Sequence, residues 1–156
     1  MRVTAETIEE QRTYLLAHAD RYVALINAAR ERLGEHFDQH VAPVDRDGVE
    51  HVLTDIFADP ATAANVTGLV LILRELDVVG DYPGFIVDEM LGRQLAATIA
   101  GGQPAATLAE ATFHFIDITH HESDYAGRDD LDAAVAAGVQ TRLPGWGWQE
   151  RPAPFE

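Results

Sequence analysis

Residues 107–124 read Thr-Leu-Ala-Glu-Ala-Thr-Phe-His-Phe-Ile-Asp-Ile-Thr-His-His-Glu-Ser-Asp, and they carry two side-chain patterns on one predicted helix. At about 100° per residue, one side of this helix gathers an apolar stripe made of Leu108, Ala111, Phe115 and Ile118. The other side gathers, within about 60°, the polar residues Glu110, His114, Asp117 and His121. We expect the stripe to face the core and the polar flank to face outward.

The polar flank has two interpretations. Carboxylates and imidazoles at positions i, i+4, i+7 and i+11 are suitable ligands for a divalent metal. One helix offers only two or three of them to one ion, so a metal site needs further ligands, for which Asp88, Glu89, His18 and Asp20 are the candidates. We favour a solvated face with i,i+4 pairs. A metal-binding protein or metal-dependent enzyme is the alternative.

No catalytic motif is present in the sequence. It contains no Gly-x-Ser-x-Gly elbow, no His-Glu-x-x-His helix and no dinucleotide-binding fingerprint. It has no cysteine, which excludes disulfides, thiolate zinc sites and cysteine nucleophiles and fits a cytosolic protein. We therefore assign no catalytic residue and expect no cofactor.

The charge is strongly acidic. Against 26 Asp and Glu stand 11 basic residues, all of them Arg, for a formal net charge of −15. Such a surface repels DNA, RNA and anionic lipid, because binding to phosphate depends on cationic contacts. It favours solubility or a basic protein partner.

The chain shows no sign of membrane insertion or secretion. Its first residues lack a basic-then-apolar signal pattern. The most apolar run, residues 66–73, is far shorter than the ~20 residues that span a bilayer. We expect a soluble, cytoplasmic protein.

Apolar periodicity predicts an all-α, single-domain bundle of about six helices over residues 1–145. The first helix starts at Thr4 or Thr7, with Thr7–Glu10 in the form of a capping box, and runs unbroken to about Gly34. Its two apolar stripes are typical of a bundle helix, and they also permit a homodimer through this helix.

The middle of the chain predicts three further helices. Asp47 with Glu50 is expected to cap a short helix that ends at Asp59, and Pro60 then opens the next one. Residues 61–79 are apolar on nearly every side and are expected to form the buried centre of the bundle, a strand over residues 68–73 being the alternative. Residues 85–100 follow as a helix that turns Val87, Met90, Leu91, Leu95 and Ile99 inward.

The C-terminal part predicts one more helix and a tail. Gly101 and Gly102 separate residues 85–100 from the stretch quoted above, and Asp129 and Asp130 open a last helix that ends before Pro144. Residues 146–156 form a Trp- and Pro-rich tail that we expect to be extended. It either covers the bundle or docks into a partner through its aromatic side chains.

The C-terminal half resembles the paired-helix layout of small helical immunity proteins, which neutralise bacterial polymorphic toxins. The resemblance rests on Phe-His-Phe-Ile-Asp at 113–117, the acidic pair Asp129 and Asp130, and the Ala- and Val-rich residues 135–143. It covers about a third of the chain. Members of this family bind and occlude a toxin without a cofactor, so the resemblance implies the same for this chain.

The leading expectation is a non-catalytic binding module, an acidic inhibitor or immunity protein that masks a basic partner. The residues expected to face that partner are Asp117, Glu122, Asp124, Asp129, Asp130, Trp146 and Trp148. Two alternatives stay open. One is the metal site on Glu110, His114, Asp117 and His121, and the other is a structural subunit packed through the first helix and the tail.

Overall fold

The structure, a computed structural model, describes residues 1–76, 86–119 and 128–146. Within these ranges every regular element is helical, which confirms the predicted all-α class. The elements are α1 (Ala5–Ala17), α2 (Ala19–His36), α3 (Arg46–Ala58), α4 (Pro60–Glu75), the π-helical η1 (Ile86–Gly92), α6 (Arg93–Ala100), α7 (Ala105–Thr119) and α8 (Arg128–Gln140). The described part thus holds seven α-helices, where about six were predicted.

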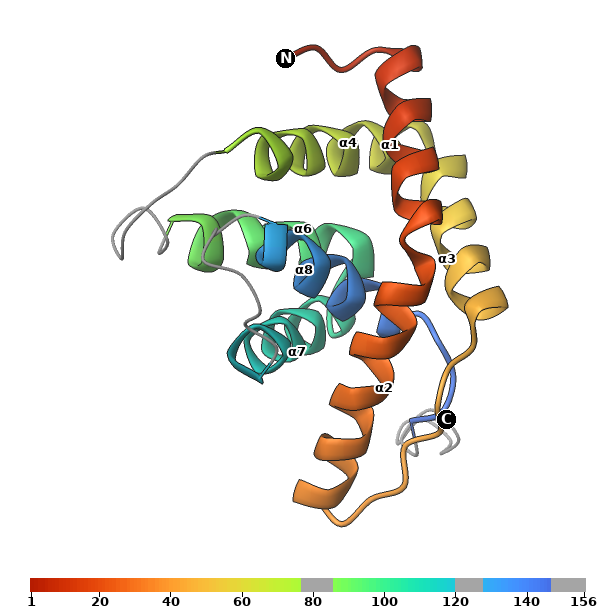
Figure 1. The fold of residues 1–156 in the computed structure, drawn as a ribbon, viewed down its shortest axis with the longest axis vertical. Coiled ribbons are helices and arrows are strands. Elements are labelled where there is room, and N and C mark those ends of the chain that lie inside the picture. Colours follow the sequence, from red (N-terminus) through yellow and green to blue (C-terminus); the bar gives the residue numbers. More distant parts are fainter. Residues whose placement is uncertain (77–85, 120–127, 147–156) are drawn as a thin grey trace.

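Two groups of helices cross each other (Figure 1). The helices α1 and α2 follow one another as a long column, and α3 packs against both. Beside this column, α4, α6, α8 and α7 lie roughly crosswise to it. The second group contacts the first mainly through α2 against α8 and α1 against α4.

The additional helix arises because the predicted long first helix is interrupted at His18. There the backbone leaves helical geometry (φ −100°, ψ 12°), and the His18 N–H donates to Leu15 O at 3.1 Å. The His18 ring Nδ1 lies 2.7 Å from Tyr14 O, the carbonyl that a continuous helix would offer to the backbone of His18. A side chain that competes for a helical carbonyl explains the break.

Helix caps follow the predicted chemistry with two changes of residue. The capping box of α1 is formed by Thr4 and Thr7, not by Thr7 and Glu10. The cap of α3 is Asp45, whose Oδ1 accepts from Gly48 N at 2.7 Å, and not Asp47. Pro60 opens α4 as predicted, with Asp59 as its cap. Because α4 continues to Glu75, the strand alternative over residues 68–73 is wrong.

The centre of the bundle is α8 and not the predicted segment 61–79. Within α8, residues 133–140 are all buried, and the helix contacts α2, α3, α4, η1, α6 and α7. In α4 the apolar Leu69, Leu71 and Ile72 are only half-buried. The prediction ranked segments by hydrophobicity, but the small residues of α8 let its neighbours approach: a Cβ on Gly138 would lie 2.6 Å from Ile99 Cβ.

The rotation of α7 also differs from the prediction. The side of α7 that faces the core carries Ala106, Ala109, Thr112, Phe113 and Ile116, all buried. The stripe predicted to be buried lies on an outer side, where Leu108 and Phe115 are half-buried and Ile118 is 78% exposed. In η1, Met90 is likewise exposed (60%), although it was predicted to point inward.

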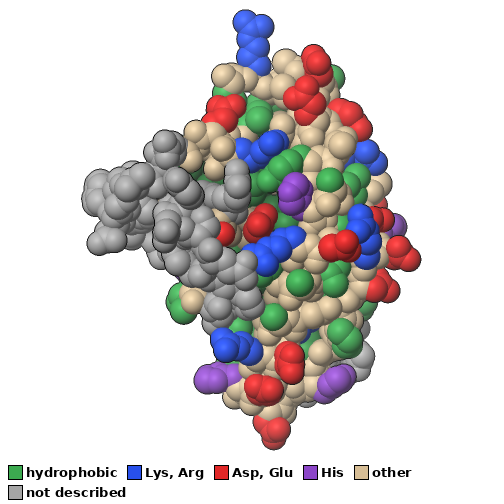
Figure 2. Space-filling view, viewed as in Figure 1, with side chains coloured by type: hydrophobic (Ala, Val, Ile, Leu, Met, Phe, Trp, Pro, Cys, Tyr) green, Lys and Arg blue, Asp and Glu red, His purple; other side chains and the backbone are tan. Residues whose placement is uncertain are grey.

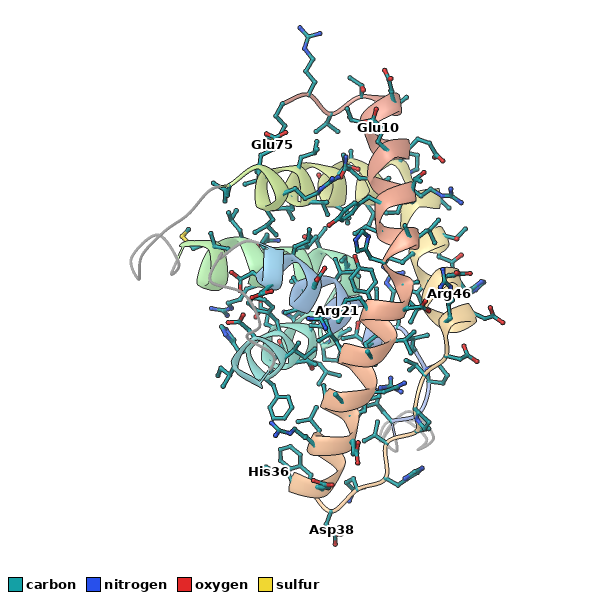
Figure 3. All side chains as sticks on the ribbon, in the orientation of Figure 1. Glu10, Arg21, His36, Asp38, Arg46 and Glu75 are labelled. Carbon is teal, nitrogen blue, oxygen red and sulfur yellow. The ribbon has the colours of Figure 1, made fainter. Side chains whose placement is uncertain are left out.

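Arginine side chains join the helices to one another. Each of six arginines makes a polar contact with another part of the chain: Arg21 with Asp132, Arg30 with Gln140 O, Arg46 with Asp20, Arg74 with Gln11, Arg93 with Glu110, and Arg142 with Ile99 O. Several of these lie between the two groups of helices, as the position of Arg21 in Figure 3 illustrates. Over half of the chain's 11 arginines therefore connect one helix or segment of the fold to another.

Among the described helices, none alone has the length and apolar character needed to cross a bilayer. The helices α3 and α4 reach that threshold only as a pair, and they meet at a bend of 108°.

Candidate functional site

The predicted polar flank of α7 does not form a metal centre with its described members. Glu110, His114 and Asp117 are half-buried, and Glu110 Oε2 accepts from Arg93 Nη2 at 3.2 Å. His121 lies outside the described residues. Within the described ranges, no group of three or more His, Asp and Glu side chains is arranged to hold a metal ion.

The residues predicted to face a partner are spread over different environments. Asp117 and Asp129 are half-buried, whereas Asp130, in the first turn of α8, is only 5% exposed. That position suits a carboxylate, because a helix N-terminus carries partial positive charge. Glu122, Asp124 and Trp148 lie outside the described residues. Trp146 is half-buried and lines a cavity.

This cavity, of about 580 Å³, lies between the C-terminal end of α2 and the outer side of α7, and we call it the apolar cavity. It is lined mostly by hydrophobic side chains: Leu33, Phe37, Gln39, His40, Val41, Leu108, Ala111, Thr112, Phe115 and Trp146. Phe37 (65% exposed) and Ala111 are exposed, so the cavity opens to solvent. Its size and lining are those of a binding pocket, typically ~300–1,000 Å³ and mainly apolar.

A chain of hydrogen bonds fixes two walls of the apolar cavity. Trp146 Nε1 donates to Gln140 Oε1 at 3.0 Å, and Gln140 Nε2 donates to Thr112 Oγ1 at 3.2 Å. Thr112 Oγ1 in turn donates to Leu108 O at 2.7 Å. The Trp146 wall and the α7 wall are therefore connected through α8.

Arg30 holds the third wall, formed by α2, against the end of α8. Its side chain is 2% exposed, and its two terminal nitrogens donate to four carbonyl oxygens at 2.7–3.3 Å: those of Ala42, Gln140, Leu143 and Pro144. Burial lowers the pKa of Arg30 to about 10. The guanidinium also lies 5.3 Å from the Trp146 ring centroid, within the range of a cation–π contact.

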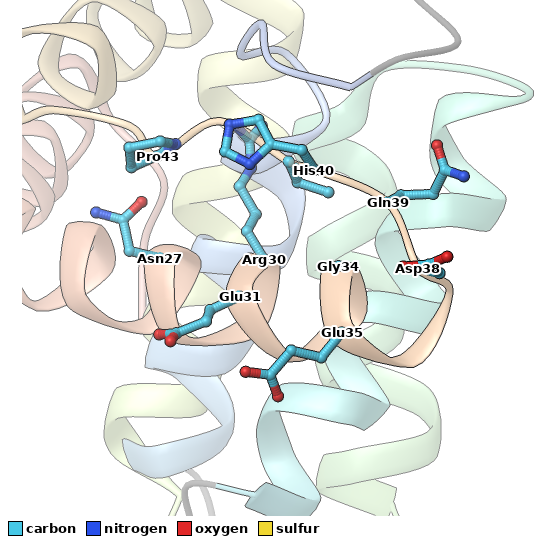
Figure 4. Close-up of a pocket in the computed structure, with 10 residues that line it drawn as sticks. Asn27, Arg30, Glu31, Gly34, Glu35, Asp38, Gln39, His40 and Pro43 are labelled. Carbon is cyan, nitrogen blue, oxygen red and sulfur yellow. The ribbon is translucent and has the colours of Figure 1, made fainter.

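Two further hollows border the apolar cavity. One, of about 600 Å³ and shown in Figure 4, lies on the other side of residues 39–41 and is lined by the carboxylates of Glu31, Glu35 and Asp38. The other is smaller and shares Phe115 with the apolar cavity and Glu35 with the hollow of Figure 4. We call Glu31, Glu35 and Asp38 the acidic rim; all three are exposed.

A tight approach of the backbone shapes the acidic rim. Gln39 N donates to Gly34 O at 2.8 Å, and a Cβ on Gly34 would lie 2.5 Å from Gln39 O. Only glycine lets the chain fold back this closely onto α2. Residues 39–41 consequently separate the apolar cavity from the rim.

Part of this site was visible in the sequence. The stripe Leu108, Ala111, Phe115 and Ile118 was identified, but it was assigned to the core. Phe37, Gln39, His40 and the three rim carboxylates were missed. One feature of the sequence indicates this site: the same helix carries a second apolar face, made of Ala109, Phe113 and Ile116. A helix on the surface of a bundle needs only one apolar face toward the core, so the other face is free to line a binding site.

Comparison with known proteins gives a family and no nearer relative. No curated protein and no solved structure matches the chain. The model of the family described as "Domain of unknown function (DUF7984)" matches residues 1–156, the whole chain. The protein therefore belongs to the DUF7984 family.

Proposed function

We propose that this protein is a non-catalytic binding module that masks a basic protein partner. The observation that carries the proposal is the open apolar cavity beside three exposed carboxylates at the C-terminal end of α2. An exposed hydrophobic site with a polar border is the usual form of a protein-binding surface. As proposed, binding needs no cofactor.

Electrostatics supports the choice of a basic partner. Asp and Glu side chains are spread from top to bottom over the coloured part of the face shown in Figure 2, and the chain carries a net charge of −15. The cations of Arg21, Arg30 and Arg74 are engaged in contacts between helices. A negative field of this kind accelerates encounter with a positive protein and disfavours nucleic acid and anionic lipid.

In its more specific form, the proposal is an inhibitor or immunity protein. Two observations support it: the resemblance carried by residues 113–117, 129–130 and 135–143, and the acidity expected of an inhibitor that occludes a basic cleft. The proposal moves the centre of recognition from Asp129 and Asp130 to the apolar cavity and the acidic rim.

The test is a salt-dependent purification of the complex from the native source. The full chain is used as bait at about 0.1 M and about 1 M salt, which shortens the Debye length from ~10 Å to ~3 Å. We expect one stoichiometric partner with a basic isoelectric point, retained at low salt and released at high salt.

Two double variants separate local recognition from net charge. Glu35→Gln with Asp38→Asn removes two charges from the rim, and Glu10→Gln with Glu75→Gln removes two at the opposite end of the molecule (Figure 3). We expect only the first pair to weaken the complex. A partner that is acidic, or a complex that both pairs weaken equally, would contradict the proposal.

A further inference from the structure

We propose that the apolar cavity seats the hydrophobic side chains of an amphipathic helix from the partner, and that Arg or Lys residues at one end of that helix contact the acidic rim. This inference rests on the proposed function, because it names the part of the basic partner that binds. It follows from the shape of the apolar surface and from the distribution of charge around it.

The apolar surface continues beyond the cavity along α7. Leu108, Ala111 and Phe115 line the cavity, and Ile118 extends the same stripe with 78% of its side chain exposed. From Leu108 to Ile118 the stripe is about 15 Å long at ~1.5 Å per residue. On the opposite wall, Phe37 is 65% exposed.

An elongated stripe between two helices suits a third helix better than a compact ligand. Amphipathic helices bind in such grooves by placing residues i, i+3 or i+4, and i+7 along one apolar face. The cavity receives the largest of these side chains, and the open stripe toward Ile118 accommodates the following turn.

Charge defines the orientation of the bound helix. The acidic rim lies beyond residues 39–41, which also line the cavity, and the C-terminus of α2 adds partial negative charge there. Two cations stand against these three carboxylates: Arg30, which is buried and donates to backbone carbonyls, and Arg32, which lines the small hollow beside Glu35. The rim therefore keeps an excess of negative charge. The basic end of the partner helix therefore belongs over the end of α2.

The chain's own surface gives little reason for a second copy to occupy the groove. Each copy carries a charge of −15 and would bring further carboxylates toward the rim. Like charges placed opposite each other disfavour such an interface. The carboxylates of the rim attract a cationic segment and repel a second copy.

The test uses fluorescein-labelled helical peptides and the full chain. The first peptide carries Leu and Phe at i, i+3 and i+7 with three Arg at one end, and a matched peptide carries Glu in place of Arg. A third peptide has Ser in place of Leu and Phe. Fluorescence anisotropy at low salt is expected to show the first peptide binding at least about tenfold more tightly than either of the others.

Variants of the full chain locate the binding. Ala111→Gln fills the mouth of the cavity without a change of charge, and Ala111 is exposed, so the fold is retained. We expect this substitution to weaken the Arg peptide about tenfold or more. Met90→Ser is the control, because Met90 is also an exposed apolar residue, on η1, and does not line the cavity. It should bind the peptide as the unmodified chain does.

Four outcomes would overturn the inference. The first is that the Arg and Glu peptides bind equally, and the second is that Ala111→Gln binds the peptide as tightly as Met90→Ser does. The third is that Trp148→Ser in the full chain tightens peptide binding about tenfold. This result would assign the cavity to the chain's own C-terminal residues. The fourth is that native mass spectrometry of the unmodified chain detects a dimer or a bound small molecule, and that the Ala111→Gln chain lacks it. This result would assign the cavity to a second copy or to that ligand.

The same variant distinguishes this failure from failure of the proposed function. If a basic partner is recovered and Ala111→Gln does not weaken the complex, the module binds its partner elsewhere and only the helix-in-cavity inference fails. If no basic partner is recovered, the proposed function itself fails, whatever the peptides do.

Discussion

The two apolar sides of α7 carry similar residues and have different neighbours. On the inner side, Ala109, Phe113 and Ile116 are fully buried. On the outer side, Phe115 is half-buried and lines the apolar cavity together with residues of α2, whereas Ile118 is exposed beyond the cavity. The helix contacts α6 and α8 extensively but α2 only at a few positions. The comparison shows that apolar spacing identifies surfaces able to be covered, whereas the neighbouring helices decide which surface is covered within the chain.

The largest expected effect compares the two phenylalanines of α7. Phe113→Ala should lower the free energy of unfolding by about 3–5 kcal/mol, because it leaves a cavity in the core. The Phe113 ring packs closely against Gly92, where a Cβ would lie 2.3 Å from Phe113 Cζ. Phe115→Ala should cost only about 1 kcal/mol, since its side chain is only half-buried. Urea unfolding with unchanged m-values measures both, and equal losses would contradict the inside–outside distinction.

The helical class was predictable because its signals are local. Asp59 followed by Pro60 marks a helix start in any context, and Gly101, with φ 98°, ends α6 as a left-handed C-cap. The break at His18 was not predictable in this way, since it depends on a ring that bonds a backbone carbonyl only in one rotamer.

The choice of central helix failed for a different reason. Hydrophobicity favours residues 61–79 over α8, where Ala134 and Ala137 contribute little apolar area. Small side chains nevertheless allow other helices to pack closely around a helix on many sides. Which helices do so depends on the tertiary fold, and a local sequence pattern does not predict it. The site was missed for the same reason: Phe37 and Phe115 are far apart in the sequence and meet only in the fold.

The next effect concerns the wall of the apolar cavity that α2 forms opposite the outer side of α7. Arg30→Met should lower the free energy of unfolding by about 2–4 kcal/mol, because it removes the hydrogen bonds that the buried guanidinium donates to the carbonyls of Ala42, Gln140, Leu143 and Pro144. Arg32→Met, two residues away and exposed, is the matched control and should change stability by less than about 0.5 kcal/mol. Equal melting temperatures for the two variants would mean that Arg30 does not hold this wall.

The smallest expected effect tests whether the complete burial of a polar group in the core lowers stability. Tyr22 is completely buried, and its hydroxyl has no hydrogen-bond partner among the described residues. Because a buried hydroxyl without a partner loses its bonds to water, Tyr22→Phe should raise the free energy of unfolding by up to about 1 kcal/mol at neutral pH. Tyr14→Phe, on a half-buried ring of α1, should change it by less than about 0.5 kcal/mol.

The same substitution makes a prediction about alkaline pH. Burial, and secondarily the carboxylate of Asp132, raises the pKa of Tyr22 well above its ordinary value. The unfolded chain releases this proton near pH ~10 while the folded chain retains it, so the unmodified protein loses stability as the pH rises above about 10. Tyr22→Phe lacks this loss, and its advantage should grow from pH 9 to pH 11 by roughly 1 kcal/mol. Arg30, whose lowered pKa acts with the opposite sign, is present in both chains and cancels. The measurement is the free energy of unfolding of both chains, from chemical denaturation, as a function of pH across this range. Parallel curves of this free energy against pH would contradict the prediction, because they would show that Tyr22 ionises as readily in the folded chain as in the unfolded one.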